Sequence, residues 1–157
     1  LDQRGIPVDR VASGDQLSVC SSVSFDVLNP PISVNEDDSD NSDSIVLNVQ
    51  YDKRNLLLTG DVEGPGLDRL LSMPARTHDL VLAPHHGSKN SRPTEFLHWA
   101  QPRYVVVSSH RRKNRDLYEL LPAADRPHVF HTGLDGAVLA VISRDQVSVR
   151  SWYASPW

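Results

Sequence analysis

The chain contains a single cysteine, Cys20, among its 157 residues, so no disulfide can form within it. Cys20 ends a strand-like run over residues 17–20, where a small core residue is a more common role for cysteine than a nucleophile. No run approaches the roughly 20 apolar residues that a membrane-spanning helix needs. The formal net charge of −4 argues against a broad nucleic-acid-binding surface but leaves room for a local basic patch.

Hydrophobic residues make up 39% and charged residues 23% of the chain, which is ordinary for a globular protein. The length suits one domain with its own core, so we expect a single domain over residues 1–157. The most acidic segment, residues 36–43 (EDDSDNSD), lacks the glycine and the glutamate that a calcium-binding loop needs at its sixth and twelfth positions. We therefore expect a solvated loop there.

Short segments rich in β-branched and aliphatic residues, bounded by turn residues, predict strands. They cover residues 17–20, 23–28, 45–51, 56–59, 80–83, 104–108, 128–132, 137–142 and 146–152. Apolar spacing predicts helices over residues 67–71 and 116–121, and another after Ser91, which would cap it. His78 and His98 are expected to be packing or surface residues, and His131, at a strand end, is a weak site candidate.

Two of these strands end abruptly in residue types that commonly act as metal ligands. Residues 56–59 (LLLT) stop at Gly60 and Asp61, and residues 80–83 (LVLA) stop at residues 84–88 (PHHGS). Such apolar runs are typical of strands buried on both faces of an α/β sheet, where sites form on the loops beyond the strand ends. We therefore expect Asp61 and the two histidines of PHHGS to meet at one sheet edge.

Asp61, His85 and His86 match the ligand preferences of zinc, which takes imidazole nitrogen and carboxylate oxygen. A carboxylate can also bridge two metals that together clamp a phosphoryl group. Glycine beside each ligand permits a sharp turn. The spacing alone is equally consistent with a polar loop around the histidines and an ordinary turn at Gly60 and Asp61.

The motifs TGD at residues 59–61 and PHHGS at residues 84–88 resemble those of the metallo-β-lactamase superfamily, and more closely those of ComEC-family DNA-uptake proteins. The resemblance extends through residues 41–47, 102–108 and 132–137, and covers roughly residues 5 to 142. It implies an α/β fold: the second half of a metallo-β-lactamase-like αββα sandwich, with a mixed sheet flanked by helices.

The resemblance also implies a function. In the whole domain, Asp61 would bridge two divalent metals, zinc or manganese, and His86 would ligate one of them, with His85 as a further ligand or a residue facing the substrate. Metal-bound hydroxide would attack a phosphodiester. The activity expected from the family is that of a nuclease acting on DNA during uptake, in a parent protein at the bacterial inner membrane.

Two polar segments are candidate substrate contacts. Ser88, Lys89 and Asn90 precede a predicted helix, whose N-terminal amides suit a phosphate. The alternative for this segment is simple helix capping. The only strongly basic run contains Arg111, Arg112 and Lys113, which are candidate contacts for a DNA backbone, or else part of a charged surface loop. These six residues are the predicted substrate-binding set.

Two motifs of the family are missing. The chain lacks the His-x-His-x-Asp-His loop that supplies most ligands of both metals, and the Gly-His-Pro expected after residues 104–108. We therefore expect a fragment that binds no metal tightly and is inactive without the N-terminal half of the domain. A half-domain would expose an apolar sheet face and could self-associate. The alternative function is a non-catalytic domain that keeps the fold for binding or assembly.

Overall fold

The computed structural model describes residues 5, 7–33, 39–110, 118 and 126–154. Seven strands form one sheet in the order β1-β2-β3-β4-β5-β6-β7, and two more form a hairpin, β8–β9. The strands of the sheet are β1 (Gln16–Cys20), β2 (Val23–Asn29), β3 (Val46–Tyr51), β4 (Arg54–Leu58), β5 (His78–Leu82), β6 (Pro102–Val107) and β7 (His128–His131). The hairpin consists of β8 (Val138–Ile142) and β9 (Val147–Ser151).

The sheet is mixed, as predicted. Strands β1 to β4 pair antiparallel, whereas β4 to β7 pair parallel. Each parallel connection needs a crossover, and helices provide one between β4 and β5 and another between β5 and β6. The carboxyl ends of β4, β5, β6 and β7 therefore lie along the same edge of the sheet.

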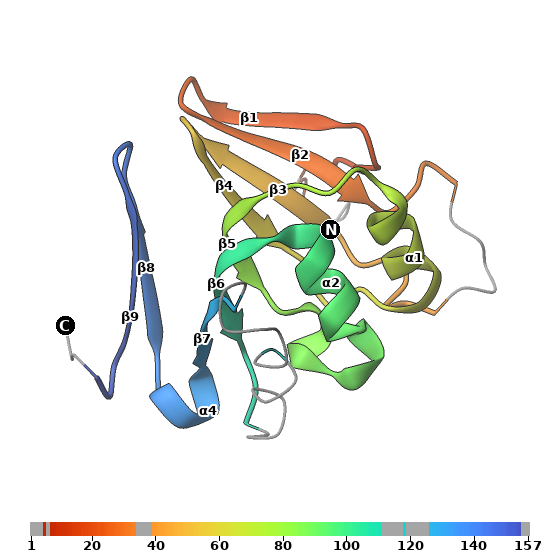
Figure 1. Ribbon diagram of the computed structural model, residues 1–157. Coiled ribbons are helices and arrows are strands. Elements are labelled where there is room, and N and C mark those ends of the chain that lie inside the picture. Colours follow the sequence, from red (N-terminus) through yellow and green to blue (C-terminus); the bar gives the residue numbers. More distant parts are fainter. Residues whose placement is uncertain (1–4, 6, 34–38, 111–117, 119–125, 155–157) are drawn as a thin grey trace.

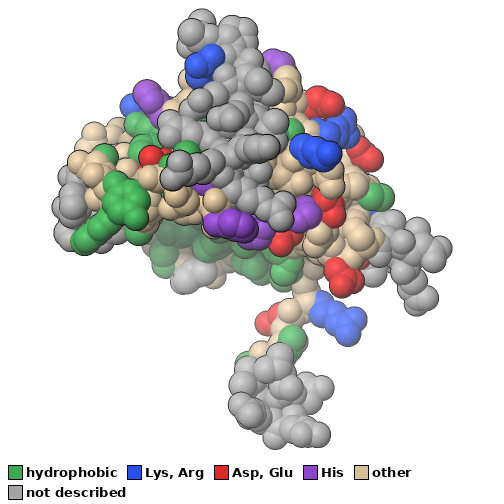
Figure 2. Space-filling view, turned by 90° about the horizontal axis from the view of Figure 1, so that it is seen from below, with side chains coloured by type: hydrophobic (Ala, Val, Ile, Leu, Met, Phe, Trp, Pro, Cys, Tyr) green, Lys and Arg blue, Asp and Glu red, His purple; other side chains and the backbone are tan. Residues whose placement is uncertain are grey.

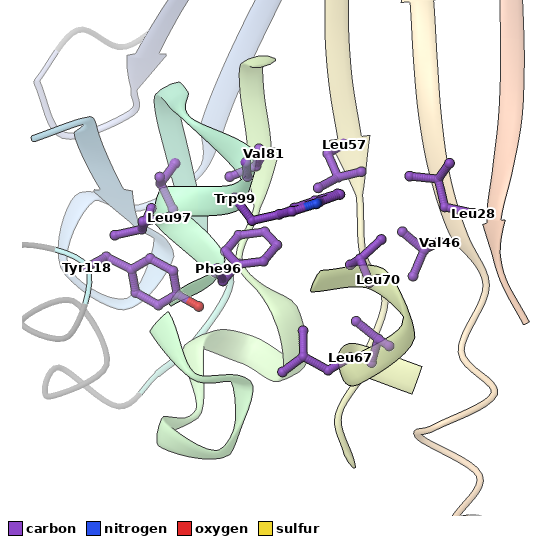
Figure 3. Packing of buried hydrophobic residues seen from close by; sticks show 14 of the residues in the cluster. Leu28, Val46, Leu57, Leu67, Leu70, Val81, Phe96, Leu97, Trp99 and Tyr118 are labelled. Carbon is purple, nitrogen blue, oxygen red and sulfur yellow. The ribbon is translucent and has the colours of Figure 1, made fainter. Parts of the chain in front are cut away.

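The helices α1 (Gly64–Ser72) and α2 (Pro93–Ala100) pack against one face of the sheet (Figure 1). Proline lies in the first turn of both helices, where its missing N–H costs nothing. The side chains of Leu67 and Leu70, spaced to share one face of α1, are buried in the core. Figure 3 shows them beside Phe96 and Trp99 of α2.

The core lies between these helices and the alternate sheet residues that face them. Those sheet residues are Leu28, Val46, Leu57, Val81, Ala83, Val105 and Val107. Tyr118 also belongs to this core, with its hydroxyl 3.3 Å from Ser91 Oγ. Burial raises the pKa of Tyr118 to about 12, because the charged phenolate would lose its hydration.

The opposite face of the sheet is also apolar, and we call it the open face. The strand registers align its side chains in two rows. One row is Phe25, Val49, Leu56, Leu80 and Tyr104, and the other is Val27, Leu47, Leu58, Leu82, Val106 and Phe130. Most of these side chains are only half-buried, and hydrophobic side chains lie along the lower side of the molecule in Figure 2.

The prediction that residues 56–59 are buried on both faces is therefore only half right. Leu57 is fully buried under the helices, whereas Leu56 and Leu58 are half-buried on the open face. The three leucines do alternate between the two faces, as strand geometry requires. In the described part of the chain, helices cover one face of the sheet and leave the other open. The sequence of three leucines could not reveal this difference between the two faces.

The β8–β9 hairpin lies apart from α1 and α2 in Figure 1. Its turn is held by Arg54 at the start of β4, which donates to the carbonyl oxygens of Arg144 and Asp145. The same guanidinium pairs with Asp79 at 3.3 Å. The predicted turn before β8 contains a short helix, α4 (Thr132–Asp135).

Three further predictions need correction. Cys20 is exposed and is not a core residue. Ser91 does not cap α2, because Arg92, in a left-handed conformation, precedes the helix. The end of the acidic segment is not simply solvated, because Ser42 is fully buried. The predicted helix over residues 116–121 lies outside the described residues, apart from Tyr118.

Within the described ranges, no helix has the length and apolar character needed to cross a membrane.

Candidate functional site

The ends of β4 and β5 are joined by hydrogen bonds. Thr59 is fully buried, and its Oγ1 donates to the carbonyl oxygen of Leu82 at 3.0 Å. The His85 amide donates to the Gly60 carbonyl at 3.1 Å. These two bonds explain why TGD and PHHGS, which lie far apart in the sequence, form one loop cluster at the sheet edge.

The two histidines have an unusual backbone. His85 has φ 46° and ψ 52°, and His86 has φ 55° and ψ 25°, so both are left-handed. This conformation costs roughly 1–2 kcal/mol for each residue other than glycine. Local strain of this kind persists only where surrounding contacts hold it, and it is common at functional sites. The hydrogen bonds of the two imidazole rings, described next, are such contacts.

The ring of His85 is held by Glu63, which lies just before α1. His85 Nδ1 donates to Glu63 Oε2 at 2.8 Å, and Asn41 Nδ2 donates to the other carboxylate oxygen at 2.9 Å. The bond from Asn41, and then the bond from His85, hold the pKa of Glu63 below its ordinary value against the effect of partial burial. A carboxylate on Nδ1–H leaves Nε2 with its lone pair, as in many metal-binding histidines.

His86 is oriented by the end of β6. Its Nδ1 donates to the Ser108 carbonyl at 2.8 Å, so Nε2 again keeps its lone pair in the neutral ring. His86 Nε2 lies 3.5 Å from Asp61 Oδ1, and the two side chains are 59% and 44% exposed. Seen from this end, the molecule shows histidine side chains beside acidic ones (Figure 2).

This geometry is compatible with a shared metal ion. Two ligand atoms each about 2.1 Å from a tetrahedral zinc lie roughly 3.4 Å apart, close to the 3.5 Å between His86 Nε2 and Asp61 Oδ1. A catalytic zinc normally has three protein ligands. The described residues contain no group of three or more histidine, cysteine, aspartate or glutamate side chains that could hold a metal. Asp61 and His86 thus fit a metal only as part of a larger ligand set.

The predicted substrate-binding residues are only partly placed. Lys89 and Asn90 are exposed in a short 3₁₀ helix (Lys89–Ser91) next to the histidines. Ser88 caps this turn, because its Oγ accepts from the Asn90 amide at 3.3 Å. Arg111, Arg112 and Lys113 lie outside the described residues.

Three other histidines do not join the Asp61–His86 pair. Two of them lie elsewhere in the fold, and the third has a structural role. His78 starts β5 at the far end of the sheet and is buried, and His98 is exposed on α2. His131 is fully buried at the end of β7. Its Nδ1 accepts from the Gly133 amide at 3.1 Å, so this nitrogen is occupied by the turn that follows.

The sequence did not reveal the residues that hold the two rings. Glu63 lies two positions after Asp61, and Asn41 belongs to the acidic segment, for which the sequence predicts a solvated loop. Ser108 acts through its backbone carbonyl, which carries no sequence signal. The closeness of Glu63 to Asp61 was the one available hint for a supporting carboxylate.

We expect Glu63→Gln to weaken metal binding at this edge by about 10- to 100-fold, the usual effect of losing a partner of a ligating histidine. Asn41 and His85 donate to different carboxylate oxygens, and in glutamine an NH2 group replaces one of them, so one of the two donors would face another donor. Manganese titration followed by electron paramagnetic resonance measures the change. Glu95→Gln, on the exposed side of α2, is the matched control. Equal affinities for both variants would mean that Glu63 does not position His85 for a metal.

Two curated proteins are similar to this chain. The chain is 31% identical over 108 residues to ComE operon protein 3 of Bacillus subtilis (strain 168), a match that covers 68% of the chain. It is 29% identical over 140 residues, 85% of the chain, to Recombination protein 2 of Haemophilus influenzae. Both proteins are homologues of this chain.

The matched segments make up 14% of the Bacillus protein and 17% of the Haemophilus protein. The chain therefore spans less than a fifth of the length of either relative. No protein-family model matches the chain.

Proposed function

We propose that this chain is the second half of a metallo-β-lactamase-like domain that hydrolyses phosphodiester bonds of DNA with the help of divalent metals. The observation that carries the proposal is the pairing of His86 Nε2 with Asp61 Oδ1 at 3.5 Å. Both histidines of the cluster have Nδ1 bound to an oxygen, which presents Nε2 as the ligand atom.

When bound, a pair of zinc or manganese ions supplies an activated water and stabilises the charge of the reacting phosphate. Within the chain, Asp61 and His86 would hold metal, with His85 beside them. Glu63 and the Ser108 carbonyl keep the two imidazole rings oriented. Lys89, exposed in the next turn, offers a positive charge to a phosphate, and beside it the Asn90 side chain hydrogen-bonds to Glu63.

The open face supports the half-domain proposal. A sheet with apolar side chains on both faces needs a second layer on each of them. The helices cover one face of this sheet, and a second sheet carrying the remaining metal ligands would cover the other. We therefore propose that the chain by itself is inactive and that the complete site forms between the two halves.

The homologues support a role in DNA uptake. One carries the name of a ComE operon protein and the other that of a recombination protein, and the motif resemblance is to ComEC-family DNA-uptake proteins. We propose that the parent protein degrades one DNA strand during uptake at the bacterial inner membrane.

The first test needs only this chain. We expect Mn²⁺ to bind weakly and to broaden the NMR signals of Gly60, Asp61 and residues 85–88, because a manganese ion relaxes nearby nuclei. His86→Gln should abolish this local broadening, whereas His98→Gln, on the exposed side of α2, should leave it unchanged. Broadening centred elsewhere, or unaffected by His86→Gln, would exclude a metal site at this edge and favour a binding or assembly role.

A further inference from the structure

A polar hollow lies at the other end of the sheet from Asp61. It consists of two adjoining depressions of about 400 and 440 Å³ that share Asn55, Thr77, His78 and Gln101. It forms where β5 begins and where the segment between α1 and β5 passes over β3 and β4. On the helix-facing side of β3, Val46 is followed by two polar residues, Asn48 and Gln50.

His78 is buried in this hollow with one nitrogen unused. It is 3% exposed, and its Nδ1 donates to the Ala100 carbonyl at 2.8 Å. Burial lowers the pKa of His78, so at neutral pH the ring is uncharged and Nε2 is a hydrogen-bond acceptor. This atom has no hydrogen-bond partner among the described residues.

Two asparagines present further unused acceptors. Asn48 is 2% exposed, and its Nδ2 donates to Asp26 Oδ2 at 3.3 Å, which fixes the orientation of the amide. The oxygens Asn48 Oδ1 and Asn55 Oδ1 are buried and lack partners in the part of the chain that the structure describes. Buried acceptors of this kind are costly unless a donor reaches them.

The outer wall of the hollow carries positively charged side chains, in contrast to the hydrogen-bond acceptors inside it. Lys53 and Arg103 line one depression and Arg76 lines the other, and all three side chains are exposed. Among the described residues, the one carboxylate that lines the hollow, Asp79, is paired with Arg54 at 3.3 Å. A fitting ligand therefore has N–H donors at one end, for the buried acceptors, and negative charge at the other, for the cations. The size of the two depressions suits a small molecule.

We propose that the polar hollow binds a nucleoside monophosphate whose base carries an exocyclic amino group. Adenine and cytosine present such an amino group, whereas thymine presents a carbonyl at the equivalent position. One N–H of the amino group donates to His78 Nε2 and the other to Asn55 Oδ1, and the phosphate lies among Arg76, Arg103 and Lys53. The hollow needs no metal and lies one strand length from Asp61. This binding site is therefore separate from the hydrolytic site proposed above.

Nucleotide titrations of the ¹⁵N-labelled chain, with EDTA present to exclude metals, test this proposal. We expect dAMP and dCMP to shift the signals of His78, Asn48 and Asn55, and to move the His78 Nε2 resonance as it accepts a hydrogen bond. We expect dTMP and inorganic phosphate to bind about tenfold more weakly, since an unmade hydrogen bond at a buried acceptor has an effect of this order.

Variants separate the two ends of the hollow. Arg76→Ala should weaken dAMP and phosphate alike, whereas Asn55→Ala should reduce dAMP affinity toward that of dTMP and leave phosphate unchanged. Asn55 is half-buried, so this variant is expected to fold even if His78→Phe does not. Arg10→Ala, which removes an exposed cation that lines neither depression, is the control that should change nothing.

Equal binding of dAMP and dTMP would overturn the proposal, because the buried acceptors would then play no part. Signal shifts confined to residues 85–90 would also overturn it, and would place the nucleotide at the hydrolytic site. An absence of any shift would overturn it as well, since the hollow would then hold only water. None of these results bears on metal binding by Asp61 and His86, so the two proposals fail independently.

Discussion

Replacing Asp61 by asparagine is expected to lower the DNA hydrolysis proposed for the complete domain about 100- to 1,000-fold. A bound metal contributes several kcal/mol of transition-state stabilisation, and each 1.36 kcal/mol corresponds to a factor of about ten in rate. Asparagine keeps the size of the side chain but loses the charge that would hold the ion against His86, 3.5 Å away. Cleavage of a labelled DNA substrate in Mn²⁺ or Zn²⁺ measures the loss.

Asp68→Asn is the matched control for this experiment. Asp68 is exposed on α1 and pairs with Arg92, so its replacement should change the rate little, as is usual for surface ion pairs. Metal content, determined on the same samples, should fall in Asp61→Asn and stay constant in Asp68→Asn. Full cleavage by Asp61→Asn would show that the hydrolytic site does not depend on this carboxylate.

The second large effect is expected for Gly66→Ala, which should destabilise the fold by about 3 kcal/mol or more. An added Cβ at Gly66 would lie 2.0 Å from the Ser42 carbonyl oxygen and 2.9 Å from the Ser42 carbonyl carbon. Both atoms belong to the backbone, so relief requires a shift of α1 away from the segment around Ser42. Forced overpacking of this kind typically costs about 1–3 kcal/mol and sometimes more.

The clash would also break a specific bond, because the Gly66 amide donates to the buried Ser42 Oγ at 2.9 Å. Gly64→Asn is the control, since Gly64 has φ +54° and an added Cβ there would meet nothing within 4 Å, and asparagine tolerates this conformation. Urea unfolding should show a much lower midpoint for Gly66→Ala than for Gly64→Asn. Similar midpoints would mean that the contact between α1 and Ser42 is loose.

The strands and the site-bearing loops were largely predictable from the sequence. Apolar runs that end in Gly60-Asp61 and Pro84-His85 mark strand ends, and parallel pairing then places them at one edge. The left-handed backbone of His85 and His86 was not predictable, because contacts to residues distant in the sequence, among them Gly60, Glu63 and Ser108, hold it. Likewise, the hollow around His78 was not predictable, since its polar side chains come from β3, β4, β5 and the segments next to them, which only the fold brings together.

The open face was missed for a different reason. Its rows combine side chains from strands that are distant in sequence, such as Val49, Leu56 and Leu80, which only the strand registers align. A strand covered by helices on one face and by another layer on the second has the same composition as a strand covered by helices on both. Composition therefore could not decide between these architectures.

The strained turn of His85 and His86 has a consequence for the exchange of metal ions at the proposed site. The ring positions are already set by hydrogen bonds to Glu63 and Ser108, so an arriving ion does not need to reorganise these two side chains. A site whose ligands are held in advance gains affinity mainly because less order has to be created on binding. Because hydrogen bonds within the chain set the ring positions, these positions would stay the same when an ion leaves, and the next ion would meet the same arrangement.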